Sequence, residues 1–406
     1  MTINDQPGGA DLVGLLGAEA CPEGLPVINV EMLRDPETLR RMREAGDLHR
    51  VNLGGREAGW LLTSHDTSWK ALVDPRMRGE SPYSRKRAPG ELADEEDLFF
   101  LPNEEHARLR RMISRPLTPR RVAALTDRIQ KEADALLDAM PPSEAVDFIA
   151  SFARPFPVAV LCELLGIPQD GRRYIRDYIY GWVAEAGEAT PVTESAGLAL
   201  ADYLRTLIAQ RRAEPKNDLI SAMAQTEGPE TSEEDVLSAV RLLLVAGNRP
   251  VTRLLTKSLG VLLHDRSHWQ RLVDDPTRID ATVEELLRIV TPIALSSRNL
   301  KEEVEIGGVL LPEGAGVHCA LGAVNRDPAH FTDPDTFDPE RPDNPHMAFG
   351  LGHRHCLGAA LARAEARIVF GTLTRRFPDM RILKDQEVHG LRPGTSRLPV
   401  VLCPVP

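Results

Sequence analysis

A ten-residue stretch near the C-terminus, residues 349–358 (FGLGHRHCLG), constrains this chain more than any other feature. It places one cysteine, Cys356, among three glycines, and the apolar spacing that follows predicts an amphipathic helix from about residue 359. Glycines let a backbone approach a flat ligand closely and adopt positive φ. Backbone N–H groups at a helix N-terminus favour a thiolate just before it, and a thiolate is a good axial ligand for iron. A buried structural cysteine in a glycine-rich turn is the alternative.

Composition excludes several classes of function. Of the 406 residues, 42% are hydrophobic and 27% charged, and no linker-like run divides them. The net charge of −11 argues against general affinity for nucleic acid or anionic membranes. No apolar run approaches the ~20 residues that span a bilayer, and the N-terminus lacks the pattern of a signal peptide. The five cysteines form no CxxC pair, so neither a disulfide framework nor a zinc site is predicted. We therefore expect a cytoplasmic protein.

Two predicted helices carry polar residues at informative spacings. His106 and Arg110 are four residues apart, so they share one helical face and can bind carboxylates together. A solvated basic face is the alternative. Thr231 and Glu234 form a predicted capping box that opens the longest helix, whose apolar pattern runs to about Leu263. The first segment is thus a candidate binding site, and the second a candidate central helix.

The stretch 349–358 resembles the haem-binding loop of the cytochrome P450 family, Phe-Gly-x-Gly-x-(His or Arg)-x-Cys-x-Gly. All six fixed positions match, namely Phe349, Gly350, Gly352, Arg354, Cys356 and Gly358. The resemblance implies the cytochrome P450 fold, mainly α with a small β region, in which residues 1–406 form a single haem-thiolate domain. It also implies haem b (iron protoporphyrin IX), with Cys356 as the proximal iron ligand. A histidine of the same loop, His353 or His355, is the competing axial ligand.

The resemblance assigns roles outside this loop as well. The family contacts the haem propionates from four positions, and this chain has basic residues at all of them: His106, Arg110, Arg298 and Arg354. Glu285 and Arg288 match the family's Glu-x-x-Arg motif and can pair on a helix. Arg341 matches the later arginine that contacts this motif in the family. We interpret these last three residues as structural rather than catalytic.

The central helix departs from the family pattern where oxygen is activated. The usual text is Ala-Gly-x-(Asp or Glu)-Thr-Thr, and this chain keeps Ala246 and Gly247 but has Arg249 for the acid and Pro250 for the catalytic threonine. Arginine is no proton donor near neutral pH, and proline has neither a hydroxyl nor an N–H. Arg249 and Pro250 are therefore the candidate catalytic positions, where substrate, ordered water or peroxide must supply what the helix lacks. Arg249 either reaches into solvent or pairs with an anion such as a substrate carboxylate.

We expect a haem-thiolate oxidoreductase that oxidises a small organic molecule as a monooxygenase in secondary-metabolite biosynthesis, with oxygen activation assisted by substrate or water. One alternative is hydrogen-peroxide-dependent oxidation of a carboxylate substrate, because a minority of P450-like enzymes of that kind also carry Arg-Pro in this helix. Oxidative coupling without oxygen insertion is a second alternative. A haem protein that binds a ligand without turnover is a third, of a different class.

The expected partners are the small-molecule substrate, a ferredoxin and a ferredoxin reductase, with no nucleic acid and no membrane. Arg111, Arg115, Arg120 and Arg121 form a local basic cluster in an otherwise acidic protein. It lies on the side where the family often receives an acidic ferredoxin, and opposite charge would steer the two proteins together. Ordinary solvated arginines are the alternative.

Overall fold

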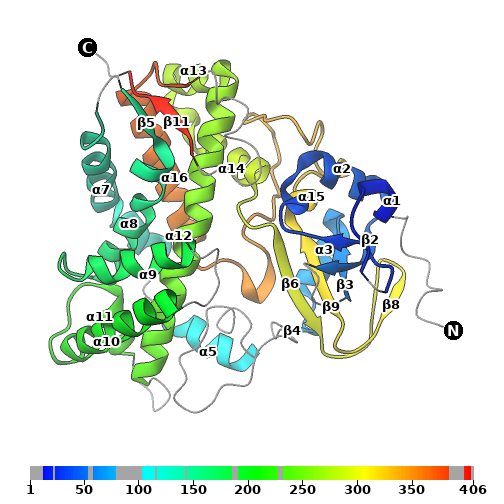
Figure 1. Cartoon of the computed structure of the whole chain (residues 1–406), viewed down its shortest axis with the longest axis horizontal. Helices are drawn as coiled ribbons and strands as arrows, with labels where there is room; N and C mark the ends of the chain where they lie inside the picture. The colour runs from blue at the N-terminus through cyan, green and yellow to red at the C-terminus, as the bar shows by residue number, and fades with distance from the viewer. Residues whose placement is uncertain are drawn as a thin grey trace.

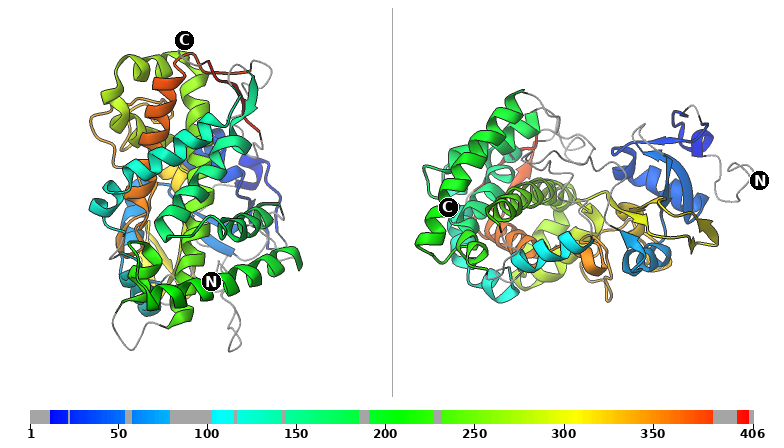
Figure 2. Two further views of the ribbon diagram at one scale, coloured as in Figure 1. Left: turned by 90° about the vertical axis from the view of Figure 1, so that its left-hand side faces the viewer. Right: turned by 90° about the horizontal axis from the view of Figure 1, so that it is seen from below.

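The structure is a computed structural model of the chain. It describes residues 12–21, 23–53, 58–78, 103–114, 117–141, 144–184, 191–226, 232–383 and 397–403. Helices gather in one part, on the left of Figure 1, and a sheet with short helices forms a second part on the right. The right-hand view in Figure 2 shows the same division into a larger helical part and a smaller β-rich part.

A six-stranded sheet forms the β-rich part, in the order β1-β2-β3-β9-β6-β4. These strands are, in that order, Val27–Ile28, Leu48–Leu53, Ala58–Leu62, Gly316–Ala320, Leu295–Leu300 and Met77–Arg78. The β1–β2 and β3–β9 pairs are parallel, and the other neighbours are antiparallel. The sheet therefore joins strands from the first 78 residues with strands from residues 295–320.

Helices cover both faces of this sheet. Leu61 of β3 packs with η2 (Met32–Arg34) and α2 (Pro36–Ala45), whereas the next residue, Leu62, packs with α3 (His65–Val73). Successive side chains of a strand point to opposite faces, so β3 contributes to the apolar core on each face of the sheet. Because both faces are covered, consecutive leucines replace the apolar–polar alternation of a half-exposed strand.

The longest helix, α12 (Glu233–His264), runs through the helical part as its axis (Figure 1). Its capping box lies one residue later than predicted: the Asp235 N–H donates to Ser232 Oγ at 3.1 Å, and the Ser232 N–H donates to the Asp235 carboxylate at 2.8 Å. Arg108 holds the same carboxylate at 2.6 Å, which favours this register. The predicted cap, Thr231, lies outside the described residues.

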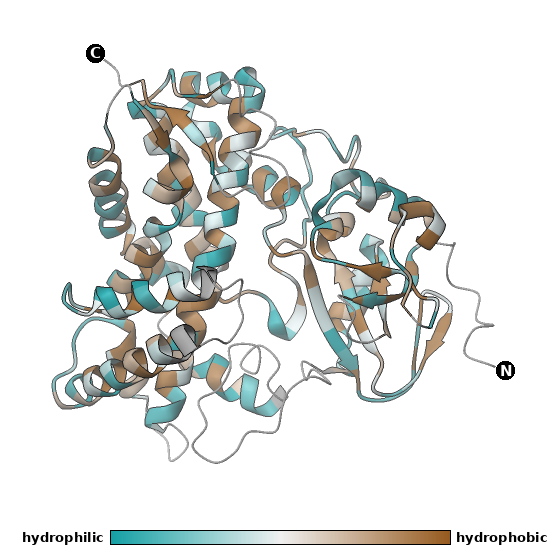
Figure 3. Cartoon of the chain, in the orientation of Figure 1, coloured by the Kyte–Doolittle hydropathy of each residue, from teal (hydrophilic) through white to brown (hydrophobic). Residues whose placement is uncertain are grey.

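The other long helices pack around α12 or on its neighbours through one apolar core. They are α5 (Asn103–Ser114), α7 (Thr126–Asp138), α8 (Pro155–Leu165), α9 (Arg172–Ala184), α10 (Pro191–Ala213), α14 (Ile279–Val290) and α16 (Ala359–Arg376). Figure 3 shows brown and teal residues mixed along them, as expected for amphipathic helices. A Cβ added at Gly247 would lie 3.0 Å from Leu161 Cδ2, so this glycine allows α12 and α8 to pack closely.

Shorter elements complete the described part of the chain. They are α1 (Leu12–Leu16), α6 (Pro119–Ala123), α11 (Leu219–Ala224), α13 (Arg266–Asp274), α15 (Leu321–Val324), β5 (Ala145–Asp147), β7 (Val304–Ile306), β8 (Val309–Leu311), β10 (Arg381–Ile382), β11 (Pro399–Val401), a π-helix (Ile149–Ala153), η4 (Pro276–Arg278) and η5 (Gly352–Arg354). Among these residues, every helix is too short or too polar to cross a bilayer.

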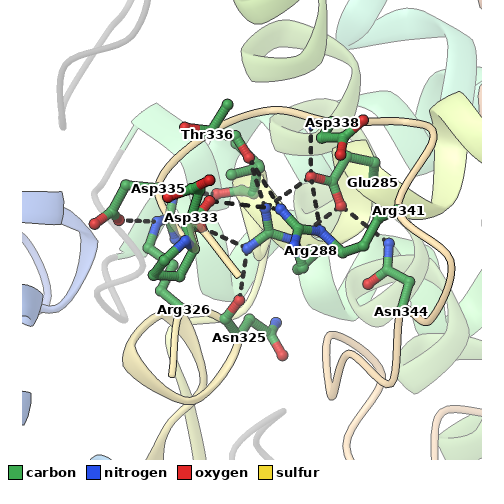
Figure 4. A network of polar contacts seen from close by, with 12 residues as sticks. Glu285, Arg288, Asn325, Arg326, Asp333, Asp335, Thr336, Asp338, Arg341 and Asn344 are labelled. Atoms are coloured by element: carbon green, nitrogen blue, oxygen red, sulfur yellow. Dashed lines mark hydrogen bonds and ion pairs between the residues drawn. The ribbon is translucent and has the colours of Figure 1, made fainter. Parts of the chain in front are cut away.

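A buried ion pair connects α14 to the chain ahead of the cysteine loop (Figure 4). Glu285 and Arg288, which were predicted to pair, are each 0% exposed, and Arg288 Nη2 lies 2.7 Å from Glu285 Oε1. Arg341 Nε lies 3.6 Å from the same oxygen. Glu285 also accepts from the Asp338 N–H at 2.9 Å and from the Asn344 amide at 3.0 Å. The buried carboxylate of Glu285 is thus ion-paired and hydrogen-bonded at both oxygens.

Arg288 extends this network towards the cysteine. It donates to the carbonyls of Asn325, Pro334 and Thr336 at 2.6–2.9 Å. The side-chain oxygen of Asn325 in turn accepts from the Met347 N–H at 2.7 Å. Burial of two charges is tolerated only when they are paired and fully hydrogen-bonded, as they are here. The segment 325–347, which leads directly into the cysteine loop, is therefore fixed to α14.

Removing the Glu285 carboxylate would leave the Arg288 charge buried without its counter-ion. We expect Glu285→Ala to lower the free energy of unfolding by about 3–5 kcal/mol, measured by urea denaturation followed by circular dichroism. Glu37→Ala is the matched control, because Glu37 pairs with Arg40 and Arg41 on an exposed face of α2, and it should change stability little. Equal losses in the two variants would contradict a central role for the buried pair.

Candidate functional site

The loop before α16 is held in one shape by glycines and backbone hydrogen bonds. Gly350 (φ 64°) and Gly352 (φ 70°) both lie in the left-handed region that favours glycine. The Cys356 N–H donates to the Phe349 carbonyl at 3.0 Å and closes the loop. Because α16 begins at Ala359, the cysteine lies just before a helix N-terminus, as the sequence predicts.

Burial and nearby positive charges shift the pKa of the Cys356 thiol in opposite directions. Part of the side chain is exposed, but protein atoms surround the sulfur closely enough that burial raises the pKa of the thiol. The Gly358 backbone N–H and the guanidinium groups of Arg110 and Arg363 act in the opposite direction and lower this pKa. These groups stabilise a negative sulfur, so the site favours a thiolate once a cation binds to it.

Basic side chains from three separate elements converge near this cysteine. His106 and Arg110 lie on α5, Arg298 on β6 and Arg354 in η5. The pKa of His106 is lowered to about 3, first by burial and then by the charges of Arg354, Arg110, His353 and Arg298. Salt screens such interactions beyond about 10 Å, so the charges that shift this pKa place the four predicted residues in one neighbourhood. None of these influences on His106 comes from a carboxylate.

This set of cations fits a ligand with negative groups. Arg298 is 8% exposed, and its Nη1 donates to the Ser297 carbonyl at 2.7 Å. Its Nε, however, is buried without an acceptor among the described residues. An unsatisfied buried donor costs about 1–3 kcal/mol, so an anionic oxygen placed there would be stabilised. A cysteine beside cations that can bind carboxylates is the donor set that haem needs, with one axial ligand for iron and partners for its propionates.

One face of α12 is basic. Arg249, Arg253 and Lys257 follow each other at intervals of four residues, so they share one helical face with Ala246 and Pro250. The side chain of Arg249 is exposed, and the other four are half-buried. The exposed guanidinium of Arg249 is accessible both to solvent and to an anionic ligand.

Arg34 of η2 brings a fourth cation to this face from the β-rich part. Burial and the charge of Arg249 lower the pKa of Arg34, and burial with Arg34 and Arg249 lowers the pKa of Arg253 to about 10. Burial, Arg253 and Arg34 lower the pKa of Lys257 to about 8. Arg253 donates to the Pro292 carbonyl at 2.7 Å, and Arg34 Nε is buried without an acceptor in the described part of the chain. Like charges held this close stabilise a bound anion.

Pro250 does not interrupt α12, which continues through it as one helix. The missing N–H leaves the Ala246 carbonyl without its usual helical donor. Thr252 has the nearest hydroxyl, but two residues correspond to about 200° around a helix, so it cannot take the direction of residue 250. Thr252 Oγ1 is buried and has no hydrogen-bond partner among the described residues. Because α12 continues through Pro250 as one helix, Thr252 is not shifted to this position.

Sequence reasoning missed three of the four cations beside α12. The spacing of Arg249, Arg253 and Lys257 is visible in the sequence as helical periodicity, but Arg34 gives no such signal because it lies in another element. In the predicted cluster near α5 and α6, Arg111, Arg120 and Arg121 are exposed, and Arg115 lies outside the described residues.

The chain is similar to known proteins over most of its length. Residues 193–389 match the family model described as cytochrome P450. The chain is 36% identical to cytochrome P450 107B1 of Saccharopolyspora erythraea, over 89% of this chain and 93% of that protein. It is 35% identical to nocardicin C N-oxygenase of Nocardia uniformis subsp. tsuyamanensis, over 87% and 91%. The solved structure of PksS, the bacillaene polyketide synthase cytochrome P450 of Bacillus subtilis 168, superposes with a TM-score of 0.81 at 31% identity, over 92% and 98%.

The conformation of the cysteine loop can be tested at Gly352. A Cβ there would lie 2.5 Å from the Leu72 carbonyl oxygen of α3, and φ is positive. Gly308 (φ 80°) has a similar conformation, but nothing lies within 4 Å of an added Cβ. In urea denaturation, we expect Gly308→Ala to cost about 1–2 kcal/mol of unfolding free energy and Gly352→Ala clearly more, because α3 must also move. Equal costs would show that α3 does not pack on the loop.

Proposed function

Because this chain belongs to the cytochrome P450 family, we propose that it holds haem b through Cys356 and uses it to oxidise a small organic molecule. Its fold is the mainly α cytochrome P450 fold with a small β region, and its activity is that of a haem-dependent monooxygenase of secondary-metabolite biosynthesis. The observation that supports the residue assignment best is the convergence of Cys356 with His106, Arg110, Arg298 and Arg354.

Each of these residues has a defined task in the proposal. The Cys356 sulfur binds the iron, and Arg110 stabilises its negative charge. His106, Arg298 and Arg354, together with Arg110, bind the propionates, and an anionic oxygen would satisfy the buried Nε of Arg298. Haem, when bound, supplies oxygen activation at its iron, and the thiolate donates electron density that favours O–O cleavage.

Proton delivery must differ from the usual acid–alcohol pair. An arginine side chain is no proton donor near neutral pH and proline has no hydroxyl, so α12 itself provides no proton donor at residues 249 and 250. We assign this task to ordered water or to the substrate, and we assign to Arg249 the binding of an anionic substrate group. The comparisons favour neither peroxide-driven oxidation, nor coupling without oxygen insertion, nor a haem protein without turnover.

The basic face of α12 supports an anionic substrate. Arg249 is exposed, and its charge lowers the pKa of both Arg34 and Arg253, so the three cations lie close together. A carboxylate or phosphate bound between them would relieve this repulsion. The substrate class that fits is therefore a small molecule with one anionic group.

Electrons come from a redox partner, as in other bacterial members of the family, and we propose a ferredoxin with its reductase. The exposed Arg111, Arg120 and Arg121 would receive its acidic surface, because opposite charges steer the encounter. α6, which carries two of these arginines, packs against α16, the helix that follows the cysteine loop. A ferredoxin bound there would lie on the cysteine side of haem. We place the enzyme in the cytoplasm, where such partners occur.

Replacing Cys356 tests the iron ligand directly. We expect Cys356→Ser to abolish the thiolate-type absorption spectrum of the reduced carbon monoxide complex, because a serine oxygen does not donate as a thiolate does. Cys319→Ser, at a buried cysteine of β9, is the control and should keep that spectrum. Retention of the spectrum in Cys356→Ser would overturn the assignment.

A spectral titration of the ferric protein tests Arg249. The measured signal is loss of iron-bound water as carboxylic acids, or their neutral amides, bind. We expect acids to bind and Arg249→Ala to weaken them by about 10- to 100-fold, the value of one charge-assisted hydrogen bond. Arg271→Ala, at an exposed arginine of α13, should change nothing. A response to neutral compounds that is indifferent to Arg249 would leave this arginine as a solvated side chain.

A further inference from the structure

Three side chains with metal-binding atoms meet where α3 begins. His65 and Asp66 are its first two residues, and His330 lies in the segment 325–347. His330 Nε2 is 2.8 Å from Asp66 Oδ1, and His65 Nδ1 is 3.9 Å from the same oxygen. The two imidazole rings stack with their centroids 3.8 Å apart. One ligand atom from each residue lies within 4.8 Å of the other two.

The buried histidine is already in the tautomer that a metal needs. The side chain of His65 is 7% exposed, and its Nε2 lies 3.1 Å from the Pro345 carbonyl oxygen. A carbonyl only accepts, so Nε2 carries the hydrogen and Nδ1 of the neutral ring presents a lone pair. Nδ1 is buried and has no hydrogen-bond partner among the described residues. Metal-binding histidines are oriented in this way, with the second ring nitrogen donating to a backbone carbonyl.

The spacing suits a tetrahedral ion. Zn²⁺ binds imidazole nitrogen and carboxylate oxygen at about 2.0–2.2 Å, which places two ligand atoms roughly 3.3 Å apart. The separations of 2.8 and 3.9 Å from Asp66 Oδ1 lie on either side of this value. The His330 ring must turn out of its stack with His65 so that both lone pairs point at the ion. His330 must then present a lone pair at Nε2, which requires its other neutral tautomer. The side chains of Asp66 and His330 are 72% and 29% exposed, so water can take the fourth position.

The local charge also permits a cation. The N-terminus of α3 by itself disfavours one, because the helix dipole is positive there. Two carboxylates offset this effect: Asp66 in the cluster and Asp327, whose Oδ2 accepts from the His65 N–H at 2.7 Å. The side chain of Asp327 is held in place, since its Oδ1 accepts from the Ala329 N–H at 2.9 Å.

We propose that His65, Asp66 and His330 bind a divalent transition-metal ion, with Zn²⁺ as the best match, at a structural site separate from haem. Two imidazoles and one carboxylate suit Zn²⁺, whereas Ca²⁺ and Mg²⁺ prefer all-oxygen ligand sets. The site uses no cysteine, which is why cysteine spacing does not predict it. The inference does not depend on the proposed substrate or on haem binding.

A metal here would support the cysteine loop from a distance. One end of α3 carries two of the ligands, and its other end lies against Gly352 through the Leu72 carbonyl. On the other side, Phe331 lies edge-on to His65 at 6.0 Å and below the Arg288 guanidinium at 5.1 Å. The ion would therefore join α3 to the segment that Arg288 anchors, and both border the cysteine loop.

The test uses untagged holoprotein, freed of loose metal by a chelator and titrated with ZnCl₂ by isothermal titration calorimetry. We expect one Zn²⁺ per chain with micromolar or tighter affinity, weakened at least about tenfold in His330→Ala. Asp66→Asn should weaken binding similarly while its amide keeps a hydrogen bond to His330, so folding is preserved. His268→Ala is the control, because His268 lies 3.7 Å from Asp265 but the described residues offer it no third ligand, and this variant should bind Zn²⁺ as the wild type does.

A second measurement separates metal binding from simple loss of structure. Zn²⁺ should raise the melting temperature of the wild type and of His268→Ala, but not that of Asp66→Asn. Absence of Zn²⁺ binding in the wild type would overturn the proposal. So would equal affinity in the wild type and in Asp66→Asn. In either case the three side chains form only a hydrogen-bonded clamp between α3 and the segment 325–347.

Discussion

The buried pair of Glu285 and Arg288 is the interaction on which the rest of the structure depends. Neither side chain is exposed, and each is satisfied by several partners in the segment 325–347. A buried charge destabilises the folded state unless it is paired and all its hydrogen bonds are made, so loss of either partner would be strongly destabilising. Because this segment leads into residues 349–358, the pair determines where the backbone delivers Cys356. Gly350 and Gly352 let the cysteine loop adopt its left-handed turns, but α14 places the loop.

Placement of the loop explains why cations gather around it. The protein carries a net charge of −11, yet His106, Arg110, Arg298 and Arg354 lie together and no carboxylate is among the groups that shift the pKa of His106. Such a concentration of like charge destabilises the fold unless an anion binds. The site is therefore built for its ligand rather than for the stability of the empty protein. The same reasoning applies beside α12, where four cations from two parts of the molecule meet.

The two groups of cations would divide the work of the enzyme. The group near Cys356 orients the cofactor, and the group that includes Arg34, Arg249 and Arg253 selects an anionic substrate. Replacing the usual acid and alcohol by Arg249 and Pro250 removes a proton donor and adds a binding charge at the same position. The departure of α12 from the family pattern is thus consistent with a change from proton delivery to substrate binding, with the protons supplied by water or substrate.

The sequence alone determined the family, the candidate iron ligand and the helical pairs, because these depend on spacing within one element. Residues 349–358 identify the loop, and the intervals from His106 to Arg110 and from Glu285 to Arg288 place each pair on one helical face. The sequence placed the capping box of α12 one residue too early. Two possible boxes overlap there, and Arg108 of α5 favours the later one by binding Asp235. Only the tertiary structure brought Arg34 to Arg249, or Asp66 to His330 across 264 positions. Periodicity reports which residues share a face of one element, whereas contacts between elements are set by packing, which a single sequence does not display.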